Sequence, residues 1–171
     1  MSSYQLRPAG AGDAEQVAAV HASSSHVAYE AVAPEAGRGL PLERRRAFWR
    51  EAIQFGEPQV QVAVENTRVI GFVGFDRSRD PQSKATTGEI WALYVAPTHW
   101  GMGVGRALWD AARAGLIEEG CTEVTLWVPQ CNERALRFFE QAGFERESDA
   151  AKTAQVGSVK LDEIRLRRRL D

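Results

Sequence analysis

Residues 88–106, GEIWALYVAPTHWGMGVGR, hold residue types that together can bind a phosphate and accept a proton. Gly101, Gly103 and Gly105 alternate immediately before a segment with helical spacing. The first turn of a helix has unpaired N–H groups at the positive end of its dipole, and glycines let an anion approach them closely. The stretch therefore predicts an anion site at the start of a helix.

The spacing of these glycines argues against two other phosphate loops. A dinucleotide-binding GxGxxG fingerprint that starts at Gly101 would need glycine where Arg106 stands. A Walker loop needs Gly-Lys-Ser/Thr, which this chain lacks. For the loop taken alone, an ordinary tight turn between a strand and a helix remains the alternative.

The elements on either side must position this loop. Residues 90–95 are branched or aromatic and precede Pro97, which predicts a buried central strand. Apolar residues then recur at helical spacing up to Gly120, and residues 124–128 alternate as a strand. Asn132 is placed to cap a further helix that Gly143 ends.

Both segments resemble signatures of the GNAT superfamily of N-acetyltransferases. The family loop reads Arg/Gln-x-x-Gly-x-Gly/Ala after a strand, and this chain has Trp100 at the first position with Gly103 and Gly105 matching. Residues 132–144, NERALRFFEQAGF, resemble the family element Asn-x-x-Ala-x-x-Phe-Tyr-Glu-x-x-Gly-Phe. The tyrosine of that element is Phe139 here.

The rest of the chain fits the same fold. We expect a strand at 4–8, helices at 14–22 and 42–55 with a loop or broken helix at 26–40 between them, a hairpin of 60–65 and 69–75, a short strand at 144–146 and a last one at 163–169. The fold class is α/β (α+β mixed sheet): a GNAT-type acyl-CoA N-acyltransferase fold in one domain, 1–171, with a central mixed, mostly antiparallel sheet flanked by helices.

The resemblance implies acetyl-CoA (coenzyme A) as cofactor. The central strand and the strand at 124–128 would splay apart at a bulge, with pantetheine between them and the pyrophosphate on the main chain of the loop. The residues assigned to this cofactor are Leu93, Tyr94, Val95, Trp100, Gly101, Met102, Gly103, Val104, Gly105, Arg106, Asn132 and Phe139.

The implied reaction moves an acetyl group to a primary amine, of a small molecule or a peptide N-terminus, by direct transfer in a ternary complex. The amine must lose a proton before it attacks, and the family often places a base where Glu89 stands. An N–H near Leu93 would hold the oxyanion. Phe139 cannot protonate the leaving thiolate, so water or Tyr94 does so, or no acid is needed.

The acceptor site is implied by resemblance alone, and it comprises His26, Tyr29, Glu30 and Trp91. The competing function is a non-catalytic acyl-CoA-binding or regulatory domain, which the loss of the tyrosine at Phe139 favours. A nucleotide-binding domain is a third reading, in which ATP or NAD would stabilise the fold more than coenzyme A.

Composition describes an ordinary globular chain, with 171 residues, 44% hydrophobic, 26% charged and a net charge of -2. This charge gives no general attraction to nucleic acid or to an anionic membrane, and we expect a cytoplasmic protein. Cys121 and Cys131 lack metal-ligand spacing, so no metal and no disulfide is expected. The family often dimerises through late strands. Ile164 and Leu166 would take part in such a homodimer, whereas an edge strand with arginines at 165, 167 and 168 fits a protected monomer equally well.

Overall fold

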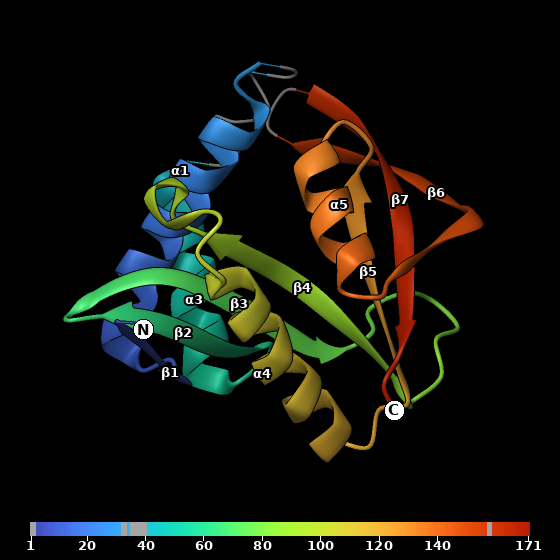
Figure 1. The fold of residues 1–171 in the computed structure, drawn as a ribbon, viewed down its shortest axis with the longest axis horizontal. Coiled ribbons are helices and arrows are strands. Elements are labelled where there is room, and N and C mark those ends of the chain that lie inside the picture. Colours follow the sequence, from blue (N-terminus) through green and yellow to red (C-terminus); the bar gives the residue numbers. More distant parts are fainter. Residues whose placement is uncertain (1–2, 32–33, 35–40, 157–158) are drawn as a thin grey trace.

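The computed structural model describes residues 3–31, 34, 41–156 and 159–171 (Figure 1). Within these described residues, seven strands form one sheet in the order β1-β2-β3-β4-β5-β7-β6. Only β4 and β5 run parallel, and every other neighbouring pair is antiparallel. The expected mixed, mostly antiparallel sheet with flanking helices is therefore confirmed.

The elements have the following bounds. The strands are β1 Tyr4–Pro8, β2 Gln59–Glu65, β3 Arg68–Arg77, β4 Thr87–Val95, β5 Glu123–Pro129, β6 Glu145–Val156 and β7 Val159–Arg169. The helices are α1 Ala14–Tyr29, α3 Leu42–Phe55, α4 Val104–Glu118 and α5 Glu133–Gln141. In the part of the chain that the structure describes, no helix has the length and apolar character needed to cross a membrane.

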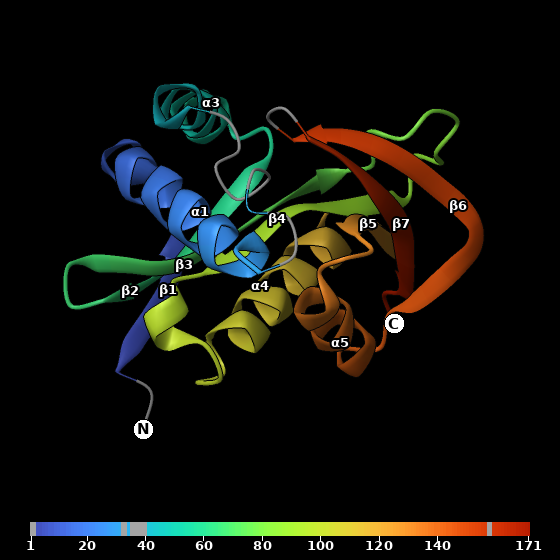
Figure 2. The same ribbon diagram turned by 90° about the horizontal axis from the view of Figure 1, so that it is seen from above.

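Helices cover both faces of the sheet (Figure 2). On one face, α1 and α3 pack over β2 and β3, where the buried Trp49 meets Phe72 with ring centroids 4.9 Å apart. On the other face, α4 and α5 pack over the centre of the sheet, and Leu108 and Leu166 are fully buried there. These two cores hold β4 between them.

Helix α1 is longer than its sequence predicts. It was expected to end at residue 22, before the serines at 23–25, but it continues to Tyr29. The Ser24 hydroxyl donates a hydrogen bond to the Val20 carbonyl of the same helix at 2.6 Å, so this serine does not interrupt it. The longer helix carries Ser24 and Tyr29 toward the middle of the sheet. Much of the loop expected at 26–40 lies outside the described residues.

Helix α3 has the predicted bounds, and its buried face includes a charged residue. The Arg45 side chain is only 6% exposed, whereas Phe48 is 47% exposed. The buried face is Arg45, Trp49 and Ala52, which are spaced at helical intervals along one stripe.

The C-terminal strands also differ from expectation. Strand β6 runs far beyond the short segment predicted at 144–146, and it forms the edge of the sheet outside β7. The expectation that the last strand is an edge was therefore wrong. Leu166 is fully buried in the core, so its side chain cannot contribute to a dimer surface.

Candidate active site between strands β4 and β5

The parallel strands β4 and β5 separate after a short seam. Thr87–Glu89 pairs with Glu123–Thr125, and no further residues of the two strands are paired. Beyond the seam, β4 remains bonded to β3 as far as Val95, and β5 remains bonded to β7 as far as Pro129. A bulge in β4 accompanies the separation, because Gly74 faces Ala92 whereas Phe75 faces Ile90. The inner edges of both strands therefore carry backbone groups without strand partners.

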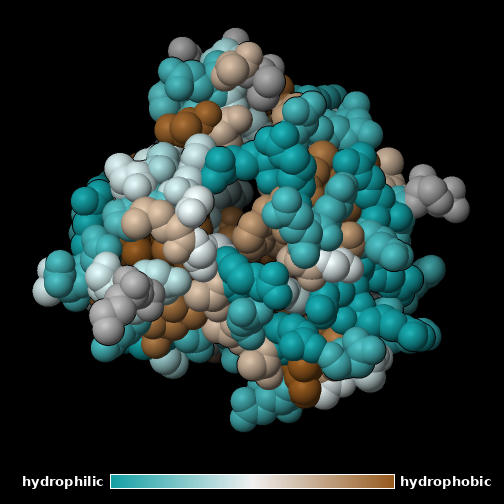
Figure 3. Space-filling model, in the orientation of Figure 1, coloured by the Kyte–Doolittle hydropathy of each residue, from teal (hydrophilic) through white to brown (hydrophobic). Residues whose placement is uncertain are grey.

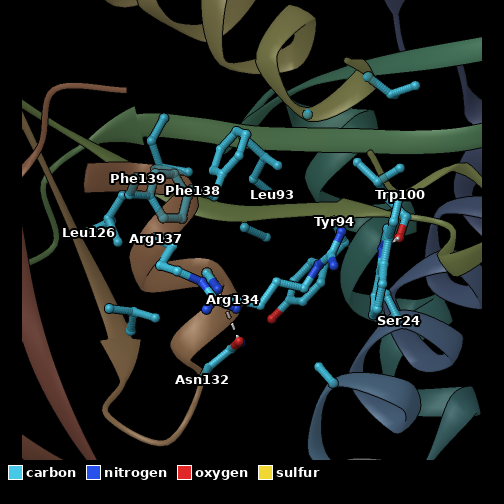
Figure 4. Close-up of a pocket in the computed structure, with 18 of the residues that line it drawn as sticks. Ser24, Leu93, Tyr94, Trp100, Leu126, Asn132, Arg134, Arg137, Phe138 and Phe139 are labelled. Atoms are coloured by element: carbon cyan, nitrogen blue, oxygen red, sulfur yellow. Dashed lines mark hydrogen bonds between the residues drawn. The ribbon is translucent and has the colours of Figure 1, made fainter. Parts of the chain in front are cut away.

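A cavity of about 540 Å³ opens between these edges, and we call it the β4–β5 cavity. Its lining includes residues 90–95 of β4 and 126–129 of β5, together with parts of α1, α4 and α5. Figure 3 shows the hollow near the centre of the molecular face, and Figure 4 shows the side chains around it. The volume lies in the range of small-molecule and cofactor sites.

The glycine loop forms the N-terminal end of α4 at one end of this cavity. Gly103 is the N-cap with φ +83°, a conformation that glycine adopts without strain, and it has no side chain to cap the helix. The first bond of the helix runs from the Ala107 N–H to the Gly103 carbonyl, so the three preceding N–H groups have no helical acceptor. Gly105 is required for packing, since a Cβ there would lie 3.1 Å from the Phe138 ring.

Trp100 adopts a role that its sequence position did not reveal. Its indole N–H donates to the Val95 carbonyl at 2.7 Å, so the backbone oxygen expected to pair with pantetheine already has a partner. The Arg134 guanidinium carbon lies 3.9 Å from the Trp100 ring centroid. Figure 4 shows Arg134 reaching from α5 toward Trp100. The pair spans the cavity from α5 to the glycine loop.

The walls of the cavity are electropositive. Arg106, Arg134 and Arg137 contribute to the lining, and none of the described residues that line it is acidic. Burial lowers the pKa of Arg134 below its ordinary value, and the neighbouring charge of Arg137 lowers it further. Arg106 pairs with Asp110 at 3.4 Å outside the lining, whereas Arg134 and Arg137 stand together in the cavity wall, an arrangement that suits a polyanionic ligand.

Glu89 lies at the end of the seam and does not line the cavity. Its side chain is 2% exposed, and its carboxylate accepts from the backbone N–H of Arg79 at 2.9 Å and from the Arg79 guanidinium at 2.6 Å. The same guanidinium stacks on Trp91 at 3.8 Å. The carboxylate oxygens that would receive a proton already accept hydrogen bonds from Arg79. This arrangement does not favour the predicted role of Glu89 as the base.

Tyr94 lines the cavity and is held by its surroundings. Its ring stacks on His21 with centroids 4.4 Å apart. Burial raises the pKa of Tyr94, opposed by the charge of Arg45 and by a hydrogen bond with Ser25, so the phenol keeps its proton at neutral pH. Phe139 also lines the cavity and is 7% exposed.

The structure brings together most, but not all, of the residues singled out from the sequence. Tyr29, Trp91 and Asn132 line the cavity, and the Asn132 side chain also caps α5 by accepting from the Ala135 N–H. Met102, His26 and Glu30 do not line it. Sequence reasoning missed Arg134, Arg137 and Phe138, although their helical spacing beyond the predicted cap at Asn132 was a usable signal.

Residues 26–144 match the family model described as Acetyltransferase (GNAT) family. The chain belongs to the GNAT family. A mycothiol acetyltransferase of Kocuria rhizophila is 34% identical over 83% of this chain, which spans 46% of that relative's length. An uncharacterised N-acetyltransferase of Bacillus subtilis, YuaI, is 26% identical over 94% of this chain and 90% of its own length.

Solved GNAT structures share the fold. An N-acetyltransferase from Staphylococcus aureus Mu50 superposes with a TM-score of 0.78 at 18% identity, covering 99% of this chain and 100% of that one. The putative acetyltransferase yncA from Salmonella typhimurium, solved with acetyl-CoA, gives 0.75 at 22% identity over 99% and 95%. The expected GNAT-type fold is confirmed.

Proposed function

We propose that this chain transfers an acetyl group from acetyl-CoA to a primary amine, of a small molecule or a peptide N-terminus, directly within a ternary complex. The observation that carries the proposal is the shared cavity: unpaired edges of β4 and β5 and the uncapped end of α4 all open into it. Pantetheine is an extended chain with two amides, which can pair with a free strand edge. The pyrophosphate fits a helix N-terminus.

The residues present fit this cofactor. The main chain of residues 100–106 would hold the pyrophosphate, with Arg134 and Arg137 adding positive charge. The main chain of β4 at Leu93 would pair with pantetheine, whereas the backbone groups of Tyr94 face Phe72 of β3. Asn132 and Phe139 would border the cofactor from the start and the face of α5. The Met102 side chain is 61% exposed and contributes only its backbone. Val95 would contribute its backbone N–H and not its carbonyl, because the carbonyl oxygen already accepts from the Trp100 indole N–H.

Acetyl-CoA supplies an activated thioester, and the chain supplies position and proton transfer. A backbone N–H near Leu93 would stabilise the oxyanion that forms on attack. The Tyr94 hydroxyl, protonated at neutral pH, would donate to the leaving thiolate. Tyr29 and Trp91 would contact the acceptor from α1 and β4.

Two of the solved neighbours support the choice of cofactor. The Salmonella protein was solved with acetyl-CoA, and a paia N-acetyltransferase from Thermoplasma acidophilum was solved with coenzyme A. A non-catalytic acyl-CoA-binding domain is the second candidate, because Phe139 lacks a hydroxyl and the oxygens of Glu89 are already bonded.

Two measurements separate these functions. We expect acetyl-CoA to raise the melting temperature while ATP and NAD at equal concentration do not, since a ligand at a hundred times its Kd adds about 2.7 kcal/mol to the free energy of unfolding. We also expect amine-dependent thiol release from acetyl-CoA over a panel of spermidine, amino acids and a short peptide with a free N-terminus. Stabilisation by acetyl-CoA without thiol release for any amine would favour the binding domain. Greater stabilisation by ATP or NAD than by acetyl-CoA would refute both functions.

A further inference from the structure

A second carboxylate lies on the face of the sheet that α1 covers. Glu163 of β7 stands opposite Pro129 of β5, as Arg165 stands opposite Trp127. Residues directly opposite in a sheet present their side chains on the same face, and Pro129 and Trp127 both line the β4–β5 cavity. Glu163 therefore lies on the same face of the sheet as these two lining residues.

Helix α1 covers this part of the face. Leu161 lies two residues before Glu163, so it shares the same face of β7, and it packs against Tyr29 at the end of α1. Tyr29 is 6% exposed, lines the cavity and interacts electrostatically with Glu163. Tyr94, the other tyrosine of the lining, also interacts with Glu163. Like Glu89, Glu163 does not itself line the cavity, but these neighbours place its carboxylate beside the end of the cavity that Tyr29 borders.

The Glu163 carboxylate differs from Glu89 in having free oxygens. Among the described residues it makes no hydrogen bond and no ion pair, although Lys152 stands directly opposite it on β6. Burial raises the pKa of Glu163, the charges of Lys152 and Arg79 lower it, and that of Glu89 raises it again. The charged and titratable groups facing it are Lys152, Arg79, Glu89, Tyr29 and Tyr94.

We propose that Glu163, and not Glu89, accepts the proton of the acceptor amine. This inference rests on the proposed function. Glu89 then acts as a positioning residue that fixes Arg79 against Trp91 in the cavity wall.

The proton balance is complete without a further reactant. An N–H bond of the ammonium breaks, and its proton passes through water to the Glu163 carboxylate. The neutral nitrogen bonds to the thioester carbon, the C–S bond breaks, and the thiolate leaves with the electron pair. The second proton of the nitrogen reaches the thiolate, and Glu163 returns its proton to solvent.

The test compares Glu163→Gln with Glu89→Gln, using acetyl-CoA and the amine of the panel that wild type acetylates fastest. We expect kcat/KM of Glu163→Gln to fall on the order of a hundredfold near pH 7, the lower end of general-base effects. The deficit should shrink as pH rises toward the pKa of the amine, because free amine then replaces the base. Asp162→Asn is the matched control, since Asp162 is exposed on the opposite face of β7.

Further measurements distinguish a folding defect from the loss of the general base. Glu163→Gln should keep the wild-type circular dichroism and the wild-type stabilisation by acetyl-CoA, and Glu163→Asp should recover part of the rate with a wild-type pH profile. A deficit that stays constant with pH, or a pH-dependent loss in Glu89→Gln instead, overturns the assignment to Glu163. A wild type that acetylates no amine refutes the proposed function itself.

Discussion

His21 provides a test of how the buried layer between α1, α3 and β4 is held together. Burial lowers the pKa of His21 to about 3, and the positive charge of Arg45 contributes to the shift. The neutral ring accepts from the Trp49 indole N–H at 3.2 Å and stacks on Tyr94. The unfolded chain has no such environment and binds a proton near pH 6.5. Folding therefore opposes protonation of this side chain.

The sign and size of the effect follow from proton linkage. Between pH 6.5 and about 3 the unfolded state binds more protons, so the free energy of unfolding falls as pH falls. Each pH unit contributes at most about 1.4 kcal/mol, which gives at most about 2.7 kcal/mol between pH 6.5 and 4.5. Because the His21 side chain retains some exposure, we expect its contribution to the free energy of unfolding to fall by about 2 kcal/mol over this range.

Urea unfolding followed by tryptophan fluorescence at pH 6.5, 5.5 and 4.5 measures this quantity. The comparison is between wild type, His21→Gln and His26→Gln, whose histidine is exposed on the same helix. We expect the stability difference between wild type and His21→Gln to change by about 2 kcal/mol over this range. The His26→Gln curve should run parallel to wild type. Parallel curves for all three proteins would refute a neutral, buried His21.

Three further changes test the packing and the loop. Gly115→Ala should destabilise by about 1–3 kcal/mol in urea unfolding despite the better helix former, because its Cβ would lie 2.7 Å from the Phe75 ring; an increase in stability would contradict this contact. Gly103→Ala meets no atom within 4 Å, so we expect about 1 kcal/mol from its φ of +83° alone, and a much larger loss would mean that the loop is packed differently. Arg79→Met leaves the Glu89 carboxylate buried without its cation. We expect a loss of about 1–3 kcal/mol, below the usual cost of breaking a buried pair because the Arg79 side chain is 51% exposed. Adding Glu89→Gln should recover part of this loss, and no recovery would argue against the pair.

Local signals predicted the central elements well. The strand before the glycine loop, α4, β5 and α5 have nearly the predicted bounds, because alternation, helical spacing and caps such as Asn132 act within a few residues. The end of α1 was missed because serines usually break helices, and only the structure shows Ser24 bonded to its own helix. The length of β6 depends on pairing with β7, which no local pattern encodes.

The parts of the candidate site that the main chain forms could be predicted from the sequence, whereas the side-chain contacts could not. The glycine loop and the main chain of β4 follow from the two sequence signatures and line the cavity. The pairing of Glu89 with Arg79 could not be read from the sequence, since Arg79 lies in a polar segment with no pattern. Glu163 was likewise hidden, because its place beside Pro129 requires the register of β7 on β5.

The separation of β4 from β5 leaves two strand edges in the middle of a sheet, where most proteins have none. An exposed edge ordinarily recruits strands of other molecules and promotes aggregation. Here α1 and α5 flank the opening, and the cavity of about 540 Å³ is sized for a slender chain and not for another polypeptide layer. The fold can therefore keep backbone groups ready for an amide-bearing ligand without exposing the protein to self-association through them.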